Sequence, residues 1–260
     1  MRKTVVITGA SAGIGAALAR QLGARGDRLA LAARREAELQ EVARQSGAET
    51  LVVPTDVTRR SDVERLRDRA LDRFGAVDVW VNNAGRGITR PVLDLTDEEF
   101  DQIIAVNVKS ALYGMQAIAP HFLDRRRGQI VNVSSMLSRV PFATYRSAYN
   151  AAKHALNALT ANARVDLHAR CPDVHVTLVL PGLVTTEFGR NALGGSPPPR
   201  PQPAQTAEEV AAAIVQAIDA PVAEVYTNPV HAALALKYFQ DVGAFEREQA
   251  LRQAQDGTVR

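Results

Sequence analysis

A tyrosine and a lysine four residues apart are the side chains in this sequence best suited to proton chemistry. Tyr149 and Lys153 begin a segment with helical apolar spacing, so the two share one helix face. Such pairs are also common on the surfaces of ordinary helices. A free phenol has a pKa of about 10 and is a poor base at neutral pH. Because a neighbouring ammonium favours the phenolate, this pair could exchange a proton with an alcohol oxygen.

Other polar residues lie in positions from which they could assist the pair. Ser134 and Ser135 end a strand-like run and point to opposite sides if that strand is regular. Asn107 lies in a helical pattern, where a polar side chain ordinarily makes a structural hydrogen bond. Tyr145 has Tyr149 rather than a lysine four residues later, so we assign it to a substrate pocket or to packing.

A glycine-rich turn follows the first predicted strand and precedes an amphipathic helix. Its glycines, Gly9, Gly13 and Gly15, have three and then one residue between them, which differs from the common dinucleotide fingerprint. Many strand–helix turns contain glycine, but this position brings backbone N–H groups and the positive end of a helix dipole toward a pyrophosphate. Gly15 would let the helix lie close to the sheet. The turn therefore predicts a dinucleotide site.

Alternating strand and helix patterns must position these residues. Short apolar runs typical of strands buried on both faces occur at Thr4–Thr8, Arg28–Ala33, Thr50–Pro54, Val77–Asn82, Gln129–Val133, His175–Leu180 and Glu224–Thr227. Between them lie segments with apolar spacing near 3.6 residues. Right-handed crossovers then predict an α/β fold, a doubly wound parallel sheet of about seven strands with helices on both faces. We expect one Rossmann-type domain over residues 1–260.

Composition excludes several other classes of protein. With 46% hydrophobic and 23% charged residues among 260, the chain is typical of a soluble globular protein. The net charge of +3 comes without a nucleic-acid-binding motif, and no apolar run is long enough for a membrane span, so we expect neither partner. The five histidines have no metal-ligand spacing. One cysteine, Cys171, and a strand pattern starting at Thr4 favour a cytoplasmic location without a signal peptide.

Taken together, the ordered motifs resemble those of the short-chain dehydrogenase/reductase family. Thr8–Gly15, with Ser11 and Ile14, looks like that family's cofactor loop, and Asn82–Gly85 (with Asn83 and Ala84) like its asparagine-rich turn. Asn107, Ser135, Tyr149 and Lys153 match its catalytic set. The turn around the nicotinamide is matched by Pro181, Gly182, Val184 and Thr186, and the pair that touches the adenine by Asp56 and Val57. Beyond about Tyr226 no comparable motif occurs.

The resemblance implies a reaction and roles for these residues. The cofactor carries the hydride between nicotinamide and a carbonyl or secondary alcohol, and Tyr149 exchanges the proton. Lys153 would hold the ribose and lower the pKa of Tyr149, and Asn107 would hold a water that links the lysine to solvent. Ser135 would polarise the substrate oxygen. Because Ser135 precedes Tyr149 by one residue more than is usual in the family, Ser134 and Ser138 are the alternatives.

The end of the second predicted strand indicates the cofactor. Dehydrogenases that prefer NAD usually carry an acidic residue there for the ribose 2′-hydroxyl. By family resemblance that position is Ala33, and Arg34 and Arg35 follow, whose guanidinium groups suit a phosphate. The two arginines could also simply begin a solvated helix. We predict NADP(H), with NAD(H) as the alternative.

The remaining predictions concern the substrate and the partners. We interpret residues 186–205 as a mobile substrate loop and 229–254 as a helical segment that packs on the domain or on another subunit. Several apolar side chains indicate an apolar or aromatic substrate: Met136, Leu137, Val140, Phe142, Tyr145, Leu183 and Phe188. By resemblance, an alanine-rich helix after Tyr149 implies a homodimer or homotetramer. The alternatives are a non-catalytic dinucleotide sensor or scaffold and, with less support, a nucleotide-sugar epimerase.

Overall fold

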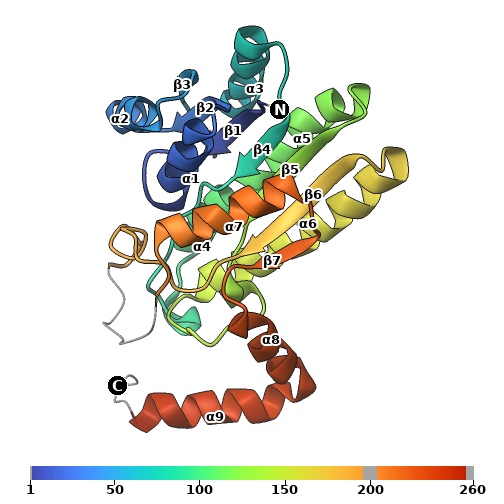
Figure 1. The fold of residues 1–260 in the computed structure, drawn as a ribbon. Helices are drawn as coiled ribbons and strands as arrows, with labels where there is room; N and C mark the ends of the chain where they lie inside the picture. Colours follow the sequence, from blue (N-terminus) through green and yellow to red (C-terminus); the bar gives the residue numbers. More distant parts are fainter. Residues whose placement is uncertain (1, 196–203, 256–260) are drawn as a thin grey trace.

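The strands form one parallel sheet in the order β3-β2-β1-β4-β5-β6-β7 (Figure 1). The computed structural model describes residues 2–195 and 204–255. Its strands are β1 (Thr4–Thr8), β2 (Arg28–Ala33), β3 (Thr50–Pro54), β4 (Val79–Asn82), β5 (Gly128–Val133), β6 (Val174–Leu180) and β7 (Glu224–Tyr226). The predicted doubly wound α/β fold is confirmed, and the order reverses between β1 and β4, the position at which such sheets bind ligands.

Continuous apolar runs explain why the central strands are parallel and buried. In β1, Val5, Val6 and Ile7 are fully buried, and Ile7 lies in register with Leu31 of β2 and Val81 of β4. Strands covered on both faces have no polar face to alternate with the apolar one.

The first three strands have the predicted bounds, and the other four differ at one end by one or two residues. The largest difference is at β4, which begins at Val79 rather than Val77. The backbone N–H of Val77 donates to Nε2 of His121 (3.2 Å), so a side chain from a neighbouring helix satisfies a group that we expected in the ladder.

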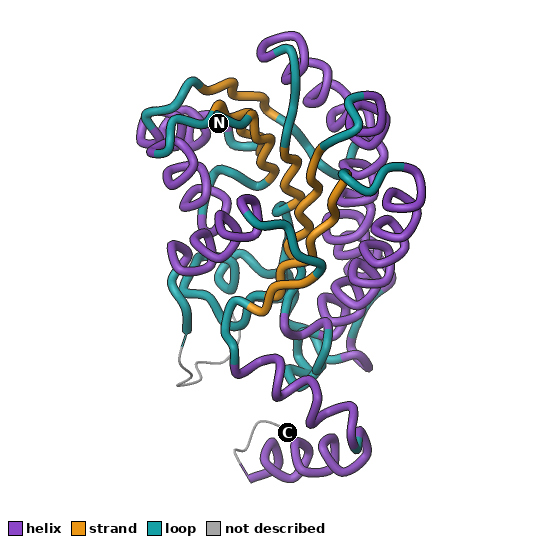
Figure 2. The backbone as a smooth tube through the Cα atoms, turned by 45° about the vertical axis from the view of Figure 1, so that its right-hand side comes forward, coloured by secondary structure: helices purple, strands orange, loops and turns teal. Residues whose placement is uncertain are grey.

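Helices cover both faces of the sheet (Figure 2). One layer consists of α1 (Gly13–Ala24), α2 (Glu36–Ser46) and α7 (Ala207–Asp219), and the other of α3 (Arg60–Phe74), α5 (Ser110–Asp124) and α6 (Ser147–Arg170). Each layer encloses its own hydrophobic core against the sheet. A capping box between Thr206 and Glu209 starts α7.

A π-helical turn interrupts the helical pattern around Asn107. Helix α4 (Asp97–Ile104) runs through the π turn Ala105–Lys109 directly into α5. One extra residue in such a turn rotates the side chains that follow, and π turns occur frequently at functional sites.

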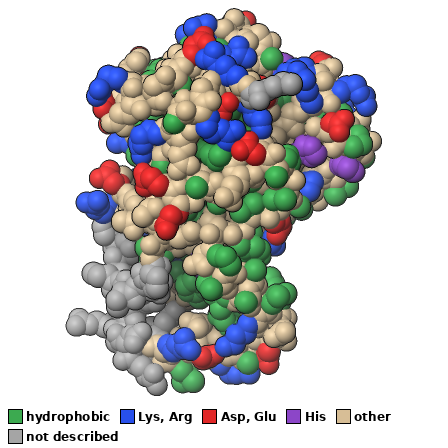
Figure 3. Space-filling model, in the orientation of Figure 1, with side chains coloured by type: hydrophobic (Ala, Val, Ile, Leu, Met, Phe, Trp, Pro, Cys, Tyr) green, Lys and Arg blue, Asp and Glu red, His purple; other side chains and the backbone are tan. Residues whose placement is uncertain are grey.

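The C-terminal segment forms two helices rather than one. Helices α8 (Val230–Gln240) and α9 (Val242–Gln255) are separated at Asp241 and extend away from the sheet (Figure 1). They are attached by a small core in which Tyr238 and Phe245 pack against Met136 and Val140. Hydrophobic side chains gather over α8 near the body (Figure 3), and Leu236 and Phe239 are among the exposed ones.

The predicted substrate loop at 186–205 is described in part, because residues 196–203 lie outside the described residues. Its described flanks are tied to the body by backbone hydrogen bonds. Leu193 donates to Gly87 (3.0 Å) and accepts from Thr89 (2.7 Å), and Thr185 donates to Gln205 (2.8 Å). None of the helices in the described part combines the length and the apolar character that a membrane span requires.

Candidate active site

Ser135, Tyr149 and Lys153 meet beside the carboxyl end of β5. Ser135 follows that strand in extended backbone and makes a side-chain hydrogen bond to Tyr149, while Tyr149 and Lys153 lie in the first two turns of α6. Lys153 Nζ is 5.6 Å from the centre of the Tyr149 ring. All three side chains are buried, with Lys153 only 3% exposed. The fold thus brings the predicted acid/base, its cation and one serine into a single cluster.

Burial controls the electrostatics of this cluster. It lowers the pKa of Lys153 to about 7, because the ammonium is removed from water. The ammonium donates to the backbone oxygen of Val133 (2.9 Å). Burial also raises the pKa of Tyr149, and the hydrogen bond from Ser135 and the positive charge of Arg146 oppose that rise. The site therefore holds a phenol whose ionisation depends on a few buried neighbours.

The three candidate serines make different contacts. The Ser134 hydroxyl donates to Oδ1 of Asn157 (2.7 Å), and Nδ2 of Asn157 donates to the Ser138 hydroxyl (2.7 Å). Both serines therefore fasten α6 to the loop after β5. Ser135 lies against Tyr149 instead and accepts from the backbone N–H of Leu137 (3.1 Å).

The Asn107 side chain is satisfied by backbone groups. Its Nδ2 donates to the oxygens of Arg86 (2.9 Å) and Ile103 (3.0 Å), and its Oδ1 accepts from the N–H of Arg86 (3.2 Å). A Cβ atom added at Gly85 would lie 2.9 Å from Asn107 Oδ1 and 3.7 Å from Lys153 Nζ. Asn107 therefore fixes the loop after β4 next to Lys153.

The glycine-rich turn packs directly on the asparagine-rich turn. Gly9 has a φ of +67°, and a Cβ there would lie 2.8 Å from Cα of Ala84. A Cβ at Gly15 would lie 2.4 Å from the Gly9 oxygen, so only a glycine at this position lets α1 lie this close to the turn. Asn83 Nδ2 donates to the Thr8 oxygen (2.9 Å) and joins the two turns.

We call the glycine-rich turn and the asparagine-rich turn that packs on it the glycine cradle. Other predicted cofactor residues border this cradle. A Cβ at Gly13 would lie 3.2 Å from Cγ2 of Thr186, so the segment after β6 crosses the glycine turn. Ile14 and Val184 pack on the core beneath α1. The turn at Pro181 is joined to the serine loop by a hydrogen bond from the N–H of Met136 (2.7 Å).

Gly182 lies against a residue that the sequence did not single out. A Cβ there would lie 2.1 Å from Cε1 of His231, near the start of α8.

The two arginines after β2 differ in their contacts. Arg35 donates to the Ser11 hydroxyl (3.2 Å) and pairs with Glu38 (3.3 Å), whereas Arg34 is exposed. A hollow beside them is lined by Ser11, Ala12, Gly13, Ala16, Arg20, Glu38, Glu41, Val42, Gln45, Thr185, Thr186, Glu187, Ala207 and Glu208. Arg35, rather than Arg34, is the cation next to the phosphate turn.

Asp56 and Val57, the pair predicted to touch the adenine, follow β3 and contact the protein itself. Asp56 Oδ1 accepts from the N–H (3.0 Å) and the hydroxyl (2.7 Å) of Thr58, which is an ordinary turn interaction. The Val57 side chain is buried in the core on the α3 side of the sheet.

The predicted pocket wall divides into two groups. Met136 and Val140 are buried against α8 and α9 and are core residues. Phe188 stands edge-on to Tyr149 with the ring centres 5.5 Å apart and is 36% exposed, and Leu183 is more exposed still. An apolar surface beside the phenol thus comes from the segment after β6.

Arg146 belongs to the site although the sequence analysis did not identify it. Its side chain is 8% exposed, lies over the Tyr145 ring (5.6 Å) and donates to the Ile88 oxygen (3.1 Å). Its place three residues before Tyr149, on the same helix face, was the available signal.

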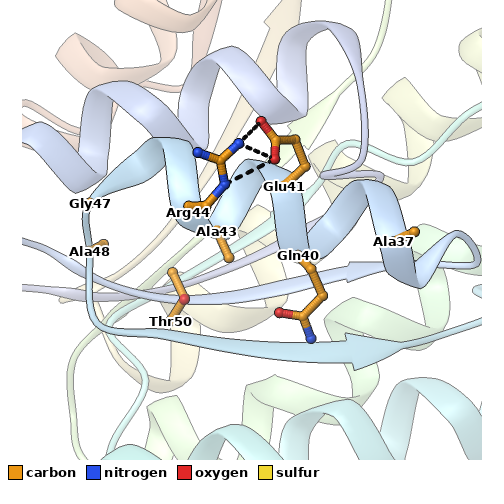
Figure 4. Close-up of a pocket in the computed structure, with 8 residues that line it drawn as sticks. All are labelled: Ala37, Gln40, Glu41, Ala43, Arg44, Gly47, Ala48 and Thr50. Atoms are coloured by element: carbon orange, nitrogen blue, oxygen red, sulfur yellow. Dashed lines mark hydrogen bonds and ion pairs between the residues drawn. The ribbon is translucent and has the colours of Figure 1, made fainter.

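A shallow hollow between α2 and the start of β3 is unrelated to this chemistry (Figure 4). Arg44 and Glu41 form an ion pair at its rim. The catalytic cluster contributes no residue to its lining. Among the described residues there is also no group of three or more histidine, cysteine or acidic side chains that could hold a metal ion.

The glycine cradle and the Ser–Tyr–Lys cluster define a dinucleotide-dependent oxidoreductase, and comparisons with known proteins agree. The family model for short chain dehydrogenases matches residues 3–194. An uncharacterized oxidoreductase of Staphylococcus epidermidis is 34% identical over 232 residues, which cover 88% of this chain and 97% of the relative.

Two solved structures extend the agreement to three dimensions. A short-chain dehydrogenase/reductase from Burkholderia phymatum in complex with NAD has a TM-score of 0.83 and 28% identity, covering 93% of this chain and 94% of that chain. An alcohol dehydrogenase from Thermococcus sibiricus complexed with 5-hydroxy-NADP has a TM-score of 0.77 and 31% identity, covering 87% and 96%. This chain belongs to the short-chain dehydrogenase family and is a nicotinamide-dependent dehydrogenase or reductase.

Proposed function

We propose that the protein interconverts a carbonyl compound and a secondary alcohol, preferring NADP(H), with Tyr149 as the acid/base. The observation that carries this proposal is the buried contact among Ser135, Tyr149 and Lys153 beside the glycine cradle. Proton exchange at an oxygen needs a titratable group and a means of stabilising its ionised form, and the cluster contains both.

The residues present fit a dinucleotide. Gly9, Gly13 and Gly85 let the loops around the site pack closely, since a Cβ at each would lie within 3.2 Å of an atom of a neighbouring segment. Backbone N–H groups at the start of a helix can then receive a phosphate. Helix α1 begins at Gly13 and directs its positive end toward that cradle. When bound there, nicotinamide supplies or accepts the hydride.

Each catalytic side chain then has a role that its contacts support. Tyr149 gives its proton to the carbonyl oxygen during reduction and removes it during oxidation. Ser135, hydrogen-bonded to that phenol, polarises the same oxygen. Lys153 holds the ribose and stabilises the phenolate, with its Nζ 5.6 Å from the centre of the Tyr149 ring. Asn107 positions the loop that faces the lysine and supplies the start of a water-linked path to solvent.

The preference for NADP(H) rests on Arg35 and Ser11. Their hydrogen bond places a guanidinium and a hydroxyl together at the end of β2, where a 2′-phosphate would accept from both. Ala33 ends the strand without a carboxylate that would repel the phosphate. The ion pair of Arg35 with Glu38 would loosen in favour of the more highly charged phosphate.

An apolar or aromatic substrate agrees with the exposed side chains near Tyr149. Phe188 presents hydrophobic surface edge-on to the Tyr149 ring, and Leu183 is an exposed hydrophobic residue of the same segment after β6. An apolar group next to the carbonyl would cover this surface, and its burial would contribute to binding.

The test is turnover of a panel of aliphatic and aromatic ketones with NADPH, followed by nicotinamide absorbance. We expect Tyr149→Phe to abolish turnover while NADPH binding, measured by calorimetry, stays within about threefold. Substantial residual activity in Tyr149→Phe would refute the role of the tyrosine. Cofactor binding without turnover of any carbonyl or alcohol would instead support a sensor.

We also propose a homodimer or homotetramer in the cytoplasm. Helix α6 presents small side chains to solvent at Ala151, Ala158 and Ala161, followed by Val165, which is 69% exposed. A face of this kind permits close packing against a second helix. Light scattering after size-exclusion chromatography measures the assembly, and a monomer at all concentrations would contradict it.

A further inference from the structure

We propose that Arg146 is a second, permanently charged cation for the catalytic phenol, which keeps Tyr149 ionisable independently of the charge on Lys153. This inference rests on the proposed role of Tyr149 as acid/base. Arg146 acts through Tyr149 and is therefore a positioning and electrostatic residue rather than a group that touches the substrate.

The fold encloses the Arg146 guanidinium in a specific place. The residue stands at the N-cap position of α6, three positions before Tyr149 and seven before Lys153, a spacing that brings the three to one side of the helix. Gly87 leaves the space that the guanidinium occupies, since a Cβ there would lie 2.6 Å from Nη1 of Arg146 and 2.9 Å from the Phe188 ring. That same ring packs edge-on to Tyr149.

The charge of Arg146 has no carboxylate against it among the described residues. No ion pair to an acidic side chain forms there: the guanidinium donates to the backbone oxygen of Ile88 (3.1 Å) and hydrogen-bonds the neutral side chain of Tyr145. Burying a charge without a counter-ion is costly, so a nearby group that can become negative is a natural partner. The ionisable groups whose charge acts on Arg146 are the phenols of Tyr145 and Tyr149.

Arg146 also completes the set of charges that face Tyr149. From α6 these are Arg146 and Lys153, and from the loop before it the titratable phenol of Tyr145. The segment after β6 contributes the neutral Phe188, and the end of β5 contributes the neutral Ser135. Both full charges are positive, so both favour the phenolate.

The two cations differ in how they respond to pH. Burial lowers the pKa of Lys153 to about 7, so its charge changes across the neutral range. Burial lowers the pKa of Arg146 as well, but a guanidinium starts so high that it stays protonated. As pH rises, the attraction from Lys153 falls while that from Arg146 persists. Arg146 therefore sustains the phenolate under the alkaline conditions in which alcohol oxidation is favoured.

The experiment is the pH profile of kcat/KM for alcohol oxidation by the full-length enzyme with NADP. Replacing Arg146 by methionine removes the charge and should move the midpoint of the rise with pH upward by about one unit. Arg146→Gln is the second neutral variant, because its amide can still donate to the Ile88 oxygen. Arg146→Lys should return the midpoint toward that of the wild type.

Arg164→Met is the matched control. Arg164 lies further along α6, is half-buried and donates to the oxygens of Val176 (2.9 Å) and Ala223 (2.7 Å), but it is remote from Tyr149. The Arg164→Met variant should be less stable than the wild type, but the midpoint of its pH profile should not shift. An unchanged midpoint in a folded neutral variant of Arg146 would overturn the inference, while activity retained by Tyr149→Phe would overturn the proposed function itself.

Discussion

The cofactor end and the catalytic end of this molecule are built on different principles. At the cofactor end, glycines let the turns pack closely on one another, and the arginines after β2 stand in solvent. At the catalytic end, Lys153, Arg146 and Tyr149 are each more than nine-tenths buried. Exposed charges are screened by water and salt, whereas buried ones act strongly over the same distances. Substitutions at the catalytic end should therefore have larger effects on the reaction than those at the exposed arginines.

Lys153→Met should produce the largest effect in this comparison. It removes a buried cation and the proposed ribose contact together, so we expect kcat/KM to fall by about 1,000-fold or more. Steady-state kinetics with NADPH and the best ketone of the panel measure it. The control is Lys237→Gln on α8, which is largely exposed and should change kcat/KM by less than about twofold. Similar losses of kcat/KM in Lys153→Met and Lys237→Gln would contradict the expected difference between a buried and an exposed lysine.

Gly15→Ala tests whether backbone approach defines the cofactor end. A Cβ 2.4 Å from the Gly9 oxygen must displace α1, and a shift of that size should reduce kcat/KM for NADPH by about 100-fold. Gly243→Ala provides the matched change in α9, where the nearest atom belongs to the flexible Arg247 side chain. Undiminished NADPH kinetics in Gly15→Ala would show that the cradle tolerates a side chain.

Arg35→Ala tests the exposed charges. We expect the Kd for NADPH to rise about 10-fold and that for NADH less than about threefold, because only the former offers a 2′-phosphate. Arg34→Ala should have a smaller effect, since Arg34 makes no contact with Ser11 corresponding to that of Arg35. Calorimetric titrations at low and high salt measure these changes. Equal losses for the two cofactors would contradict the NADP(H) preference.

Ser134→Ala should affect stability more than the reaction. It leaves the buried Asn157 carbonyl oxygen without the Ser134 donor, which costs about 1–3 kcal/mol in the free energy of unfolding. Its kcat should stay within about threefold of wild type, whereas Ser135→Ala should lose about 100-fold. Urea denaturation and steady-state kinetics of the two variants separate the structural role of Ser134 from the proposed catalytic role of Ser135. A larger loss of kcat in Ser134→Ala than in Ser135→Ala would assign the catalytic role to Ser134.

Much of the architecture could be predicted because the burial of a strand is evident from the residues of that strand alone. The run at Thr4–Thr8 is apolar on both faces, which is sufficient to indicate a central parallel strand. The ends of elements depend on distant partners instead: β4 begins late because His121 takes the Val77 N–H. The break at Asp241, where the backbone leaves helical geometry, carried no glycine or proline signal.

The candidate site shows the same division. The motifs located Tyr149, Lys153 and the glycine turn, because their spacing is short and the chemistry demands those residue types. Arginine is ordinarily exposed, so the burial of Arg146 could not be inferred without Gly87, which lies 59 residues away and leaves it room. The π turn at Asn107 is equally hidden, since one inserted residue leaves the apolar periodicity almost unchanged.

Helices α8 and α9 support the loop after β5 from outside the residues that match the family model. Residues 3–194, which match the family model, supply Ser135 and the loop that follows it. The far side of that loop rests on Tyr238 and Phe245, which lie beyond the match, and His231 abuts Gly182 at the neighbouring turn. A substitution in α8 or α9 that alters this packing would therefore act on the loop after Ser135 without changing any residue of the Ser135, Tyr149 and Lys153 cluster.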